Sequence, residues 1–137
     1  MAKDIQPVQR AVEKWGDAAE AGFQTVPDIL LKKQVELGLS ATDMLVLLNV
    51  TVHWWYKERM PFPRTSTIAA RMGVDARTVQ RSLKKMVALG LVTREVVETE
   101  NGDSQYVVDL ENLVARLGDY ARSDEAFLIR KKRKAAA

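Results

Sequence analysis

Cysteine is absent from this chain of 137 residues, and histidine occurs once. A chain without thiols has no disulfide framework, no thiolate zinc site and no cysteine nucleophile, and it suits a reducing compartment. Long apolar runs are also lacking: the longest, residues 44–56, is too short to cross a bilayer, and no signal-peptide core follows Met1. We therefore expect a compact cytoplasmic protein without membrane contact.

Sequence motifs for catalysis are lacking as well. The chain contains no Gly-x-x-x-x-Gly-Lys-[Ser/Thr] loop, no Gly-x-Ser-x-Gly elbow and no His-Glu-x-x-His helix. The lone His53 stands beside Trp54 in an apolar stretch, where an imidazole is more often a core or edge residue than a ligand or a base. We predict that the protein is not an enzyme and holds no metal and no cofactor.

The net charge of +3 conceals an uneven distribution of charge along the chain. Residues 1–56 carry 5 basic and 7 acidic side chains, whereas residues 57–94 carry 9 basic and 2 acidic ones. Residues 95–129 reverse this with 2 basic against 9 acidic side chains, and residues 130–134 are all basic. The excess of positive charge in residues 57–94 indicates a phosphate-binding surface in that segment.

Residues 65–85 predict two short helices that meet at a glycine. Thr65 is a candidate cap for the first helix, Gly73 can adopt the positive φ that ends it, and Asp75 can cap the second. Val74 is expected to be buried in the turn. Apolar residues of the second helix recur at helical spacing and predict a face toward the core: Val79, Leu83 and Met86. This layout is that of a helix-turn-helix.

The opposite face of the second helix is basic. Arg77, Arg81 and Lys84 share it, with Gln80 at its edge, and these residue types read base edges and hold phosphates in a major groove. A helical hairpin with a glycine turn and solvated lysines is not specific for DNA when it stands alone. The segment that follows this helix therefore decides between a DNA-binding motif and an ordinary helical hairpin.

A β-hairpin is predicted directly after the second helix. Residues 92–99 are rich in β-branched side chains, Asn101-Gly102 is typical of a two-residue type I′ turn, and residues 105–110 form the returning strand. Such a turn places Arg94 across from Asp109, where it would be neutralised. The fold class is thus mainly α with a small β hairpin, a winged helix-turn-helix with extra amino- and carboxy-terminal helices.

Further helices are predicted from the spacing of apolar residues on both sides of this motif. They cover residues 7–20, 27–37, 40–56, 110–117 and 123–134. The expected parts of the chain are an amino-terminal helical extension over 1–38, the winged helix-turn-helix domain over 39–121, and a basic tail or linker over 122–137. Residues 40–56 begin with a capping box at Ser40 and Asp43 and are apolar on nearly all sides. Because a small domain seldom covers every side of a helix, either the first helix wraps this one or a second subunit covers it, and we expect a homodimer.

Two resemblances to known families accompany these patterns. The first is carried by Leu39 to Leu48, Phe62-Pro63, Ile68-Ala69, Met72 to Val74, Arg77 to Leu83, and Leu89 to Val92. These residues resemble a bacterial helix-turn-helix family found in transcription regulators and in plasmid and phage replication proteins. Upstream, Gly22 to Pro27 and Leu30-Leu31 look like the amino-terminal domain of DnaD-type primosomal proteins, which are winged helices that oligomerise.

The first resemblance implies which residues contact DNA. The residues that would enter the major groove are Arg77, Gln80, Arg81 and Lys84. Those that would meet phosphates are Arg64, Thr65, Ser66, Thr67, Arg71 and Thr78. We also expect Lys85 to add a phosphate contact that does not depend on sequence.

Three functions fit this reading of the sequence. We favour a sequence-specific transcription regulator that binds double-stranded DNA at the nucleoid. The first alternative is a DNA-binding module for plasmid or phage replication initiation, or for a primosome. The second is a winged helix that binds another protein, because the wing carries acidic residues where family wings often carry Lys or Arg: Glu95, Glu98, Glu100 and Asp103. We expect this wing not to clamp DNA.

Two other segments have open interpretations. Trp54-Trp55-Tyr56 has the aromatic side chains needed to stack bases, but aromatics at the end of an apolar helix usually serve packing. The basic run 130–134 either adds non-specific phosphate affinity or is a solvated tail.

Overall fold

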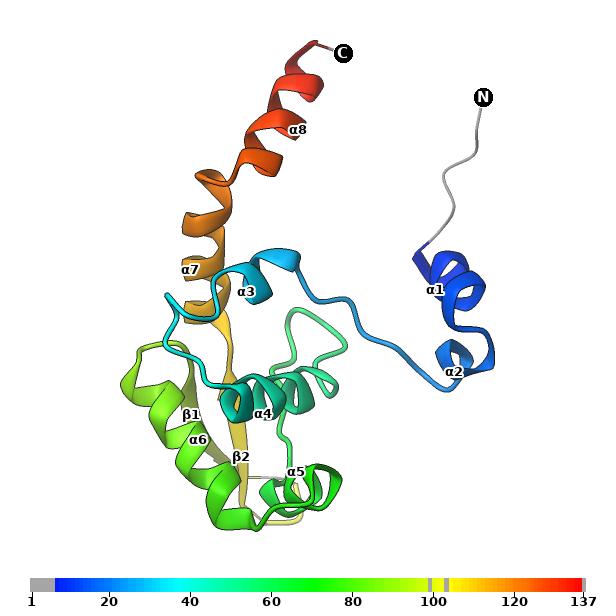
Figure 1. The fold of residues 1–137 in the computed structure, drawn as a ribbon. Coiled ribbons are helices and arrows are strands. Elements are labelled where there is room, and N and C mark those ends of the chain that lie inside the picture. Colours follow the sequence, from blue (N-terminus) through cyan, green and yellow to red (C-terminus); the bar gives the residue numbers. More distant parts are fainter. Residues whose placement is uncertain (1–6, 99, 103, 137) are drawn as a thin grey trace.

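The computed structural model describes residues 7–98, 100–102 and 104–136, and in them helices surround a two-stranded sheet (Figure 1). The elements are α1 (Pro7–Trp15), α2 (Asp17–Glu20), α3 (Asp28–Lys32), α4 (Ala41–Thr51), α5 (Thr65–Met72), α6 (Ala76–Ala88), β1 (Thr93–Glu98), β2 (Ser104–Asp109), α7 (Glu111–Arg122) and α8 (Glu125–Ala136). The predicted fold class is confirmed: the chain is mainly helical, with a small antiparallel sheet in a winged-helix arrangement.

The hydrophobic core lies where α4, α5 and α6 meet and is closed by the base of the sheet. Its fully buried side chains include Val46, Leu47, Val50, Ile68, Val79, Leu83, Met86, Leu91 and Val108. Each such residue stabilises the fold by about 1.5–3 kcal/mol relative to an exposed position. The core continues between α3 and α7, which pack on each other through buried leucines such as Leu30 and Leu113.

Helix caps fix the boundaries of the helix-turn-helix. Gly73 ends α5 with φ 68°, and the Asp75 side chain accepts a hydrogen bond from the Thr78 N–H at 2.9 Å, as predicted. Two details of the prediction are wrong. The cap position of α5 is Arg64, so Thr65 is the first helical residue, and Val74 is exposed because the left-handed turn at Gly73 directs the chain outward before α6 begins.

The register of the wing differs from the prediction by one residue. Glu98 pairs with Ser104, so the connection is longer than the expected two-residue turn, and Arg94 pairs with Val108 instead of Asp109. The Asp109 carboxylate instead accepts a hydrogen bond from the Glu111 N–H at 2.8 Å, where α7 begins. Arg94 is therefore not neutralised by Asp109. Asp103, which was predicted to add to the acidic charge of the wing, is not among the described residues.

The amino-terminal helices form an arm. The helix predicted over residues 7–20 is broken at Gly16, whose φ is 62°, so that α1 and α2 form a separate pair that stands apart from the rest of the molecule (Figure 1). Gln24 attaches the extended segment after this pair to α4: it accepts a hydrogen bond from the Thr51 hydroxyl at 2.6 Å and donates one to the Leu48 carbonyl at 3.1 Å. We call residues 7–22 the arm.

Helix α4 is shorter than predicted and is covered by its own chain. It begins at the Ser40–Asp43 capping box, which is confirmed, but it ends at Thr51 and leaves Trp54 to Tyr56 in a following turn. Five of its eleven residues are buried within one chain: Asp43, Met44, Val46, Leu47 and Val50. The chain thus covers one side of this helix without a second subunit, and exposed apolar side chains remain on α4 itself, on the arm and on α8, such as Leu45, Trp15 and Leu128.

Candidate nucleic-acid interface

Helix α6 presents a basic face opposite its buried one. Its inward residues are Val79, Ser82, Leu83 and Met86, and its exposed residues include Arg77, Gln80, Arg81 and Lys84. Within the described part of the chain, no carboxylate lies within 4 Å of the charged nitrogens of Arg77, Arg81 or Lys84. These side chains are consequently free to meet an anionic ligand.

The basic face of α6 borders a hollow of about 600 Å³ beneath the wing. The lining residues are Arg77, Gln80, Arg81, Lys84 and Val87 from α6, with Arg94 and Tyr106 from the sheet. All four residues predicted to enter the major groove thus line one surface. The Arg94 guanidinium lies 4.8 Å from the centroid of the Tyr106 ring, a cation–π contact that holds the charge over the hollow.

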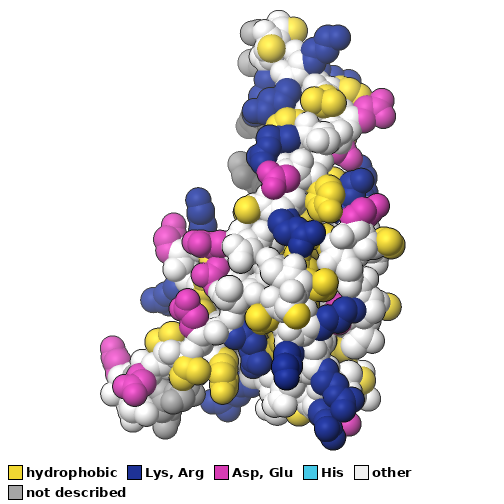
Figure 2. Space-filling view, turned by 90° about the vertical axis from the view of Figure 1, so that its left-hand side faces the viewer, with side chains coloured by type: hydrophobic (Ala, Val, Ile, Leu, Met, Phe, Trp, Pro, Cys, Tyr) yellow, Lys and Arg dark blue, Asp and Glu magenta, His cyan; other side chains and the backbone are white. Residues whose placement is uncertain are grey.

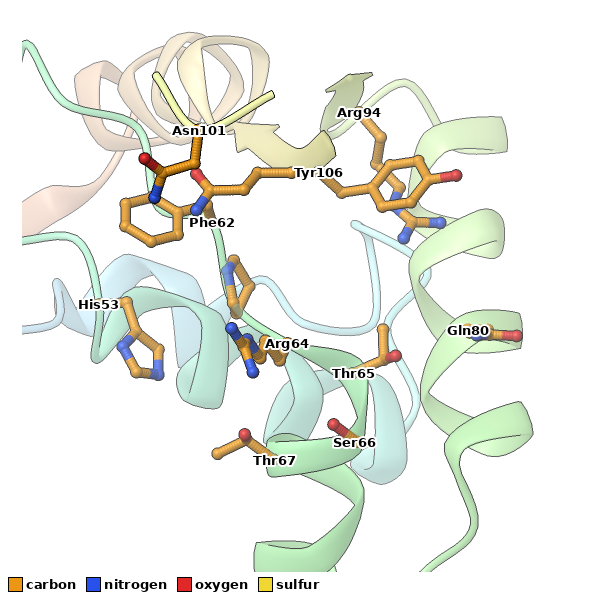
Figure 3. A pocket seen from close by; sticks show the side chains of 12 residues that line it. His53, Phe62, Arg64, Thr65, Ser66, Thr67, Gln80, Arg94, Asn101 and Tyr106 are labelled. Carbon is orange, nitrogen blue, oxygen red and sulfur yellow. The ribbon is translucent and has the colours of Figure 1, made fainter. Parts of the chain in front are cut away.

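A second hollow, of about 930 Å³, lies between the wing and the start of α5 (Figure 3). Its floor carries Arg64, Thr65, Ser66 and Thr67, and its wing side carries Arg94, Asn101, Gln105 and Tyr106. The first turn of α5 has no acidic residue, so its backbone N–H groups and three hydroxyls favour an anion. Four of the predicted phosphate contacts therefore meet in this hollow.

The two hollows form one surface, which we call the basic groove. Gln80, Arg94 and Tyr106 line both of them, and neither is lined by Asp or Glu among the described residues. Figure 2 shows Lys and Arg side chains over the lower part of the molecule as well as along its upper end, and acidic side chains on the protrusion at the lower left. A concave surface lined by one sign of charge concentrates the field that attracts a polyanion.

Three of the predicted contact residues lie outside the basic groove. Arg71 is exposed in the last turn of α5 and lines neither hollow. Thr78 donates from both its N–H and its hydroxyl to Asp75 at 2.9 Å, so it serves the cap of α6. Lys85 forms an ion pair with Asp43 at 2.6 Å, and its charge is therefore already balanced within the chain.

Asp43 is the centre of a polar cluster between α4 and α6. Its carboxylate accepts hydrogen bonds from the Ser40 N–H at 2.9 Å, the Ser82 hydroxyl at 2.7 Å and the Lys85 ammonium at 2.6 Å. Burial alone would raise the pKa of Asp43, but the hydrogen bonds from Lys85, Ser40 and Ser82 outweigh it and lower the pKa from 3.8 to about 2. This cluster fixes the orientation of α6, and hence of its basic face.

Arg94 and Tyr106 are interface residues that the sequence analysis missed. The expected two-residue turn assigned Arg94 to an ion pair with Asp109, and only the actual register brings it beside Tyr106 on the groove side of the sheet. The sequence did contain one indication of a role for Arg94. It is the last basic residue of the segment 57–94, whose excess of positive charge indicated a phosphate-binding surface. The acidic wing residues Glu95, Glu98 and Glu100 are exposed and line neither hollow.

Comparison with known proteins assigns this winged-helix domain to a family. Residues 26–126 match the DnaD N-terminal domain, and because the match covers most of the chain, the chain belongs to that family. It is similar to the replicative helicase loading/DNA remodeling protein DnaD of Bacillus subtilis (strain 168), with 26% identity over 104 residues. That alignment covers 76% of this chain and 44% of the relative, so the chain spans less than half of the relative's length.

These comparisons separate the two resemblances noted in the sequence. The resemblance to DnaD is confirmed, whereas the resemblance to transcription regulators finds no support in them. The replication alternative therefore fits better than the regulator that we favoured. Two negative findings concern the described residues alone: no helix there is long and apolar enough to cross a membrane, and no cluster of three His, Cys, Asp or Glu residues could hold a metal ion.

Proposed function

We propose that this chain is a DNA-binding module of a replication protein that takes part in helicase loading or DNA remodelling. The family supports the replication context, and the name of the Bacillus relative describes those two activities. The observation that carries DNA binding is the basic groove, where Arg77, Arg81, Lys84 and Arg94 surround a hollow without a lining carboxylate. The described residues that line the groove include basic and amide side chains but no carboxylate that could pair with a base for catalysis. We therefore propose that the module binds DNA and does not catalyse a reaction.

In this proposal α6 enters the major groove of duplex DNA. Arg77 and Arg81 are then placed to contact base edges, and Gln80 lies between them on the same face. The first turn of α5, with Thr65 to Thr67, meets the phosphates of one strand, and Arg94 meets the backbone from the wing side. The acidic wing tip lies outside this contact and is available for a protein partner.

A direct test measures the affinity of the full chain for a fluorescent duplex of two to three helical turns. The double variant Arg77→Ala, Arg81→Ala should lose at least about tenfold in affinity, equivalent to roughly 1.4 kcal/mol. The matched control is Arg130→Ala, Arg133→Ala, which removes the same charge from α8, outside the groove. Equal losses in the two variants would show that binding follows net charge alone and would refute a specific role for α6.

Self-association is the second part of the proposal. The arm carries the exposed apolar residues Val8 and Trp15, and it packs mainly within itself. A second copy of the chain is the partner that we propose for it, which would present two α6 helices to one duplex.

A further inference from the structure

The segment after α4 exposes large aromatic side chains, two of which, Trp55 and Tyr56, lie outside the duplex interface. Trp55 is 78% exposed, Tyr56 64% and Phe62 56%. The sequence interpretation of this cluster as packing holds for Trp54, which packs against the core, but not for Trp55 or Tyr56. Exposed aromatic rings in one place indicate a binding surface more often than isolated apolar residues do.

Hydrogen bonds fix the Trp55 ring and the backbone of the segment that carries Tyr56 and Phe62. The Trp55 indole N–H donates to the Val52 carbonyl at 2.8 Å, and the Arg59 N–H donates to the Tyr56 carbonyl at 3.1 Å, which closes a tight turn. The carbonyl of Pro61, next to Phe62, accepts a hydrogen bond from the Val108 N–H of the wing at 2.8 Å. The rings are thus presented by a rigid segment, so little side-chain entropy is lost when a ligand stacks on them.

The aromatic residues border the basic groove. Trp55, Tyr56 and Phe62 line a hollow of about 150 Å³ together with His53, Arg59 and Met60. His53 and Phe62 also line the groove beside α5, and Figure 3 shows them at the end of that groove away from Gln80. A ligand that leaves the groove past Arg64 therefore reaches the aromatic hollow directly.

We propose that the aromatic hollow binds single-stranded DNA, with unpaired bases stacked on Trp55 and Tyr56 and with the backbone near Arg59 and Arg64. Aromatic rings beside cations form the usual platform for single strands, because every base has a face that can stack. Residues 52–67 carry three basic side chains and one acidic one, so their charge favours a polyanion.

This inference rests on the proposed duplex interface. Together the two surfaces would bind a junction between double- and single-stranded DNA. The duplex occupies α6, its backbone passes the start of α5, and one strand continues unpaired into the aromatic hollow. Such a junction arises wherever a duplex is opened. The two surfaces share His53 and Phe62, but Trp55 and Tyr56 line the aromatic hollow alone, so the contribution of this hollow can be measured independently.

The test measures binding of the full chain to oligo-dT and, separately, to duplex DNA. The variant Trp55→Ala, Tyr56→Ala should lose at least about tenfold in oligo-dT affinity and stay within about twofold for duplex, because both residues line the aromatic hollow and neither lines the basic groove. The matched control Phe23→Ala removes an exposed aromatic residue from the segment between the arm and α3 and should change neither affinity. Trp55→Phe keeps a ring that can stack and should retain most of the oligo-dT binding, while the quenching of tryptophan fluorescence by oligo-dT should decrease.

The outcomes separate the two proposals. Wild-type protein that binds duplex but not oligo-dT, or a Trp55→Ala, Tyr56→Ala variant with unchanged oligo-dT affinity, would overturn the single-strand site and leave duplex binding intact. The second result would assign the aromatic hollow to a protein partner. Conversely, Arg77→Ala, Arg81→Ala should weaken duplex binding while oligo-dT binding persists. Thermal unfolding of each variant shows that lost binding is not lost folding.

Discussion

The side-chain ammonium of Lys85 lies 2.6 Å from the Oδ2 atom of Asp43, which joins α6 to the capping box of α4. The neighbouring Lys84 lines the basic groove and has no such partner among the residues that the structure describes. Two adjacent lysines on one helix therefore have different roles: one positions the helix, and the other faces the ligand. The distinction can be tested with single substitutions.

Replacing each lysine by alanine should separate stability from DNA binding. Lys85→Ala leaves the buried Asp43 carboxylate with fewer donors and should lower the free energy of unfolding by about 1–2 kcal/mol, a value reduced by the partial exposure of Lys85. Lys84→Ala should change stability by less than about 0.5 kcal/mol but weaken duplex binding and reduce the salt slope by about one. Urea unfolding and titrations of anisotropy at several salt concentrations measure both quantities. A Lys84→Ala variant as unstable as Lys85→Ala would contradict the assignment.

The lowered pKa of Asp43 predicts a loss of stability in acid. The pKa is about 2 in the folded chain and 3.8 ordinarily, so ionised Asp43 stabilises the fold fully above about pH 5, and this contribution disappears as the pH falls through 2. The difference in unfolding free energy between wild type and Asp43→Asn should shrink by about 2 kcal/mol over that range. Chemical denaturation at a series of pH values measures it. A difference that stays constant with pH would mean that Asp43 is not the titrating group.

The parts of the fold that were predictable from sequence depend on local chemistry. Ser40 and Asp43 form their capping box, Asp75 caps α6 and Gly73 takes a positive φ, because each depends on residues three or four positions apart. The basic face of α6 was predictable for the same reason, since helical spacing alone places Arg77 and Arg81 on one side.

The errors concern contacts between distant residues. The partner of Lys85 lies 42 positions away on α4, and no local pattern distinguishes Lys85 from Lys84. The wing register depended on the length of one connection, and a shift by one residue moved Arg94 from Asp109 to Val108. The exposure of Trp55 followed from the end of α4 at Thr51, a boundary that apolar composition did not indicate.

The contribution of the wing to DNA binding should come from Arg94 and not from the acidic residues. Arg94 lines both hollows of the basic groove, whereas Glu95 and Glu100 line neither. Arg94→Ala should lower duplex affinity by at least about fivefold, roughly 1 kcal/mol. Glu95→Gln with Glu100→Gln should leave it within about twofold, because these charges do not approach the phosphates. A large gain in affinity from the glutamine variant would show that the acidic residues lie against DNA.

The arm should control self-association without supporting the fold. Among its described side chains only Ala19 is fully buried, and α1 packs mainly against α2, so deletion of residues 1–21 removes little of the core. The truncated chain should keep a cooperative unfolding transition and the helical circular dichroism of the remaining elements. Light scattering should show that it is a monomer at tens of micromolar, where we expect the full chain to be a dimer. The control is Leu128→Ser, Ile129→Ser, which removes exposed apolar residues from α8 and should leave the dimer intact. If the truncated chain remains a dimer and the α8 variant dissociates, the interface lies at the carboxy-terminal helix instead.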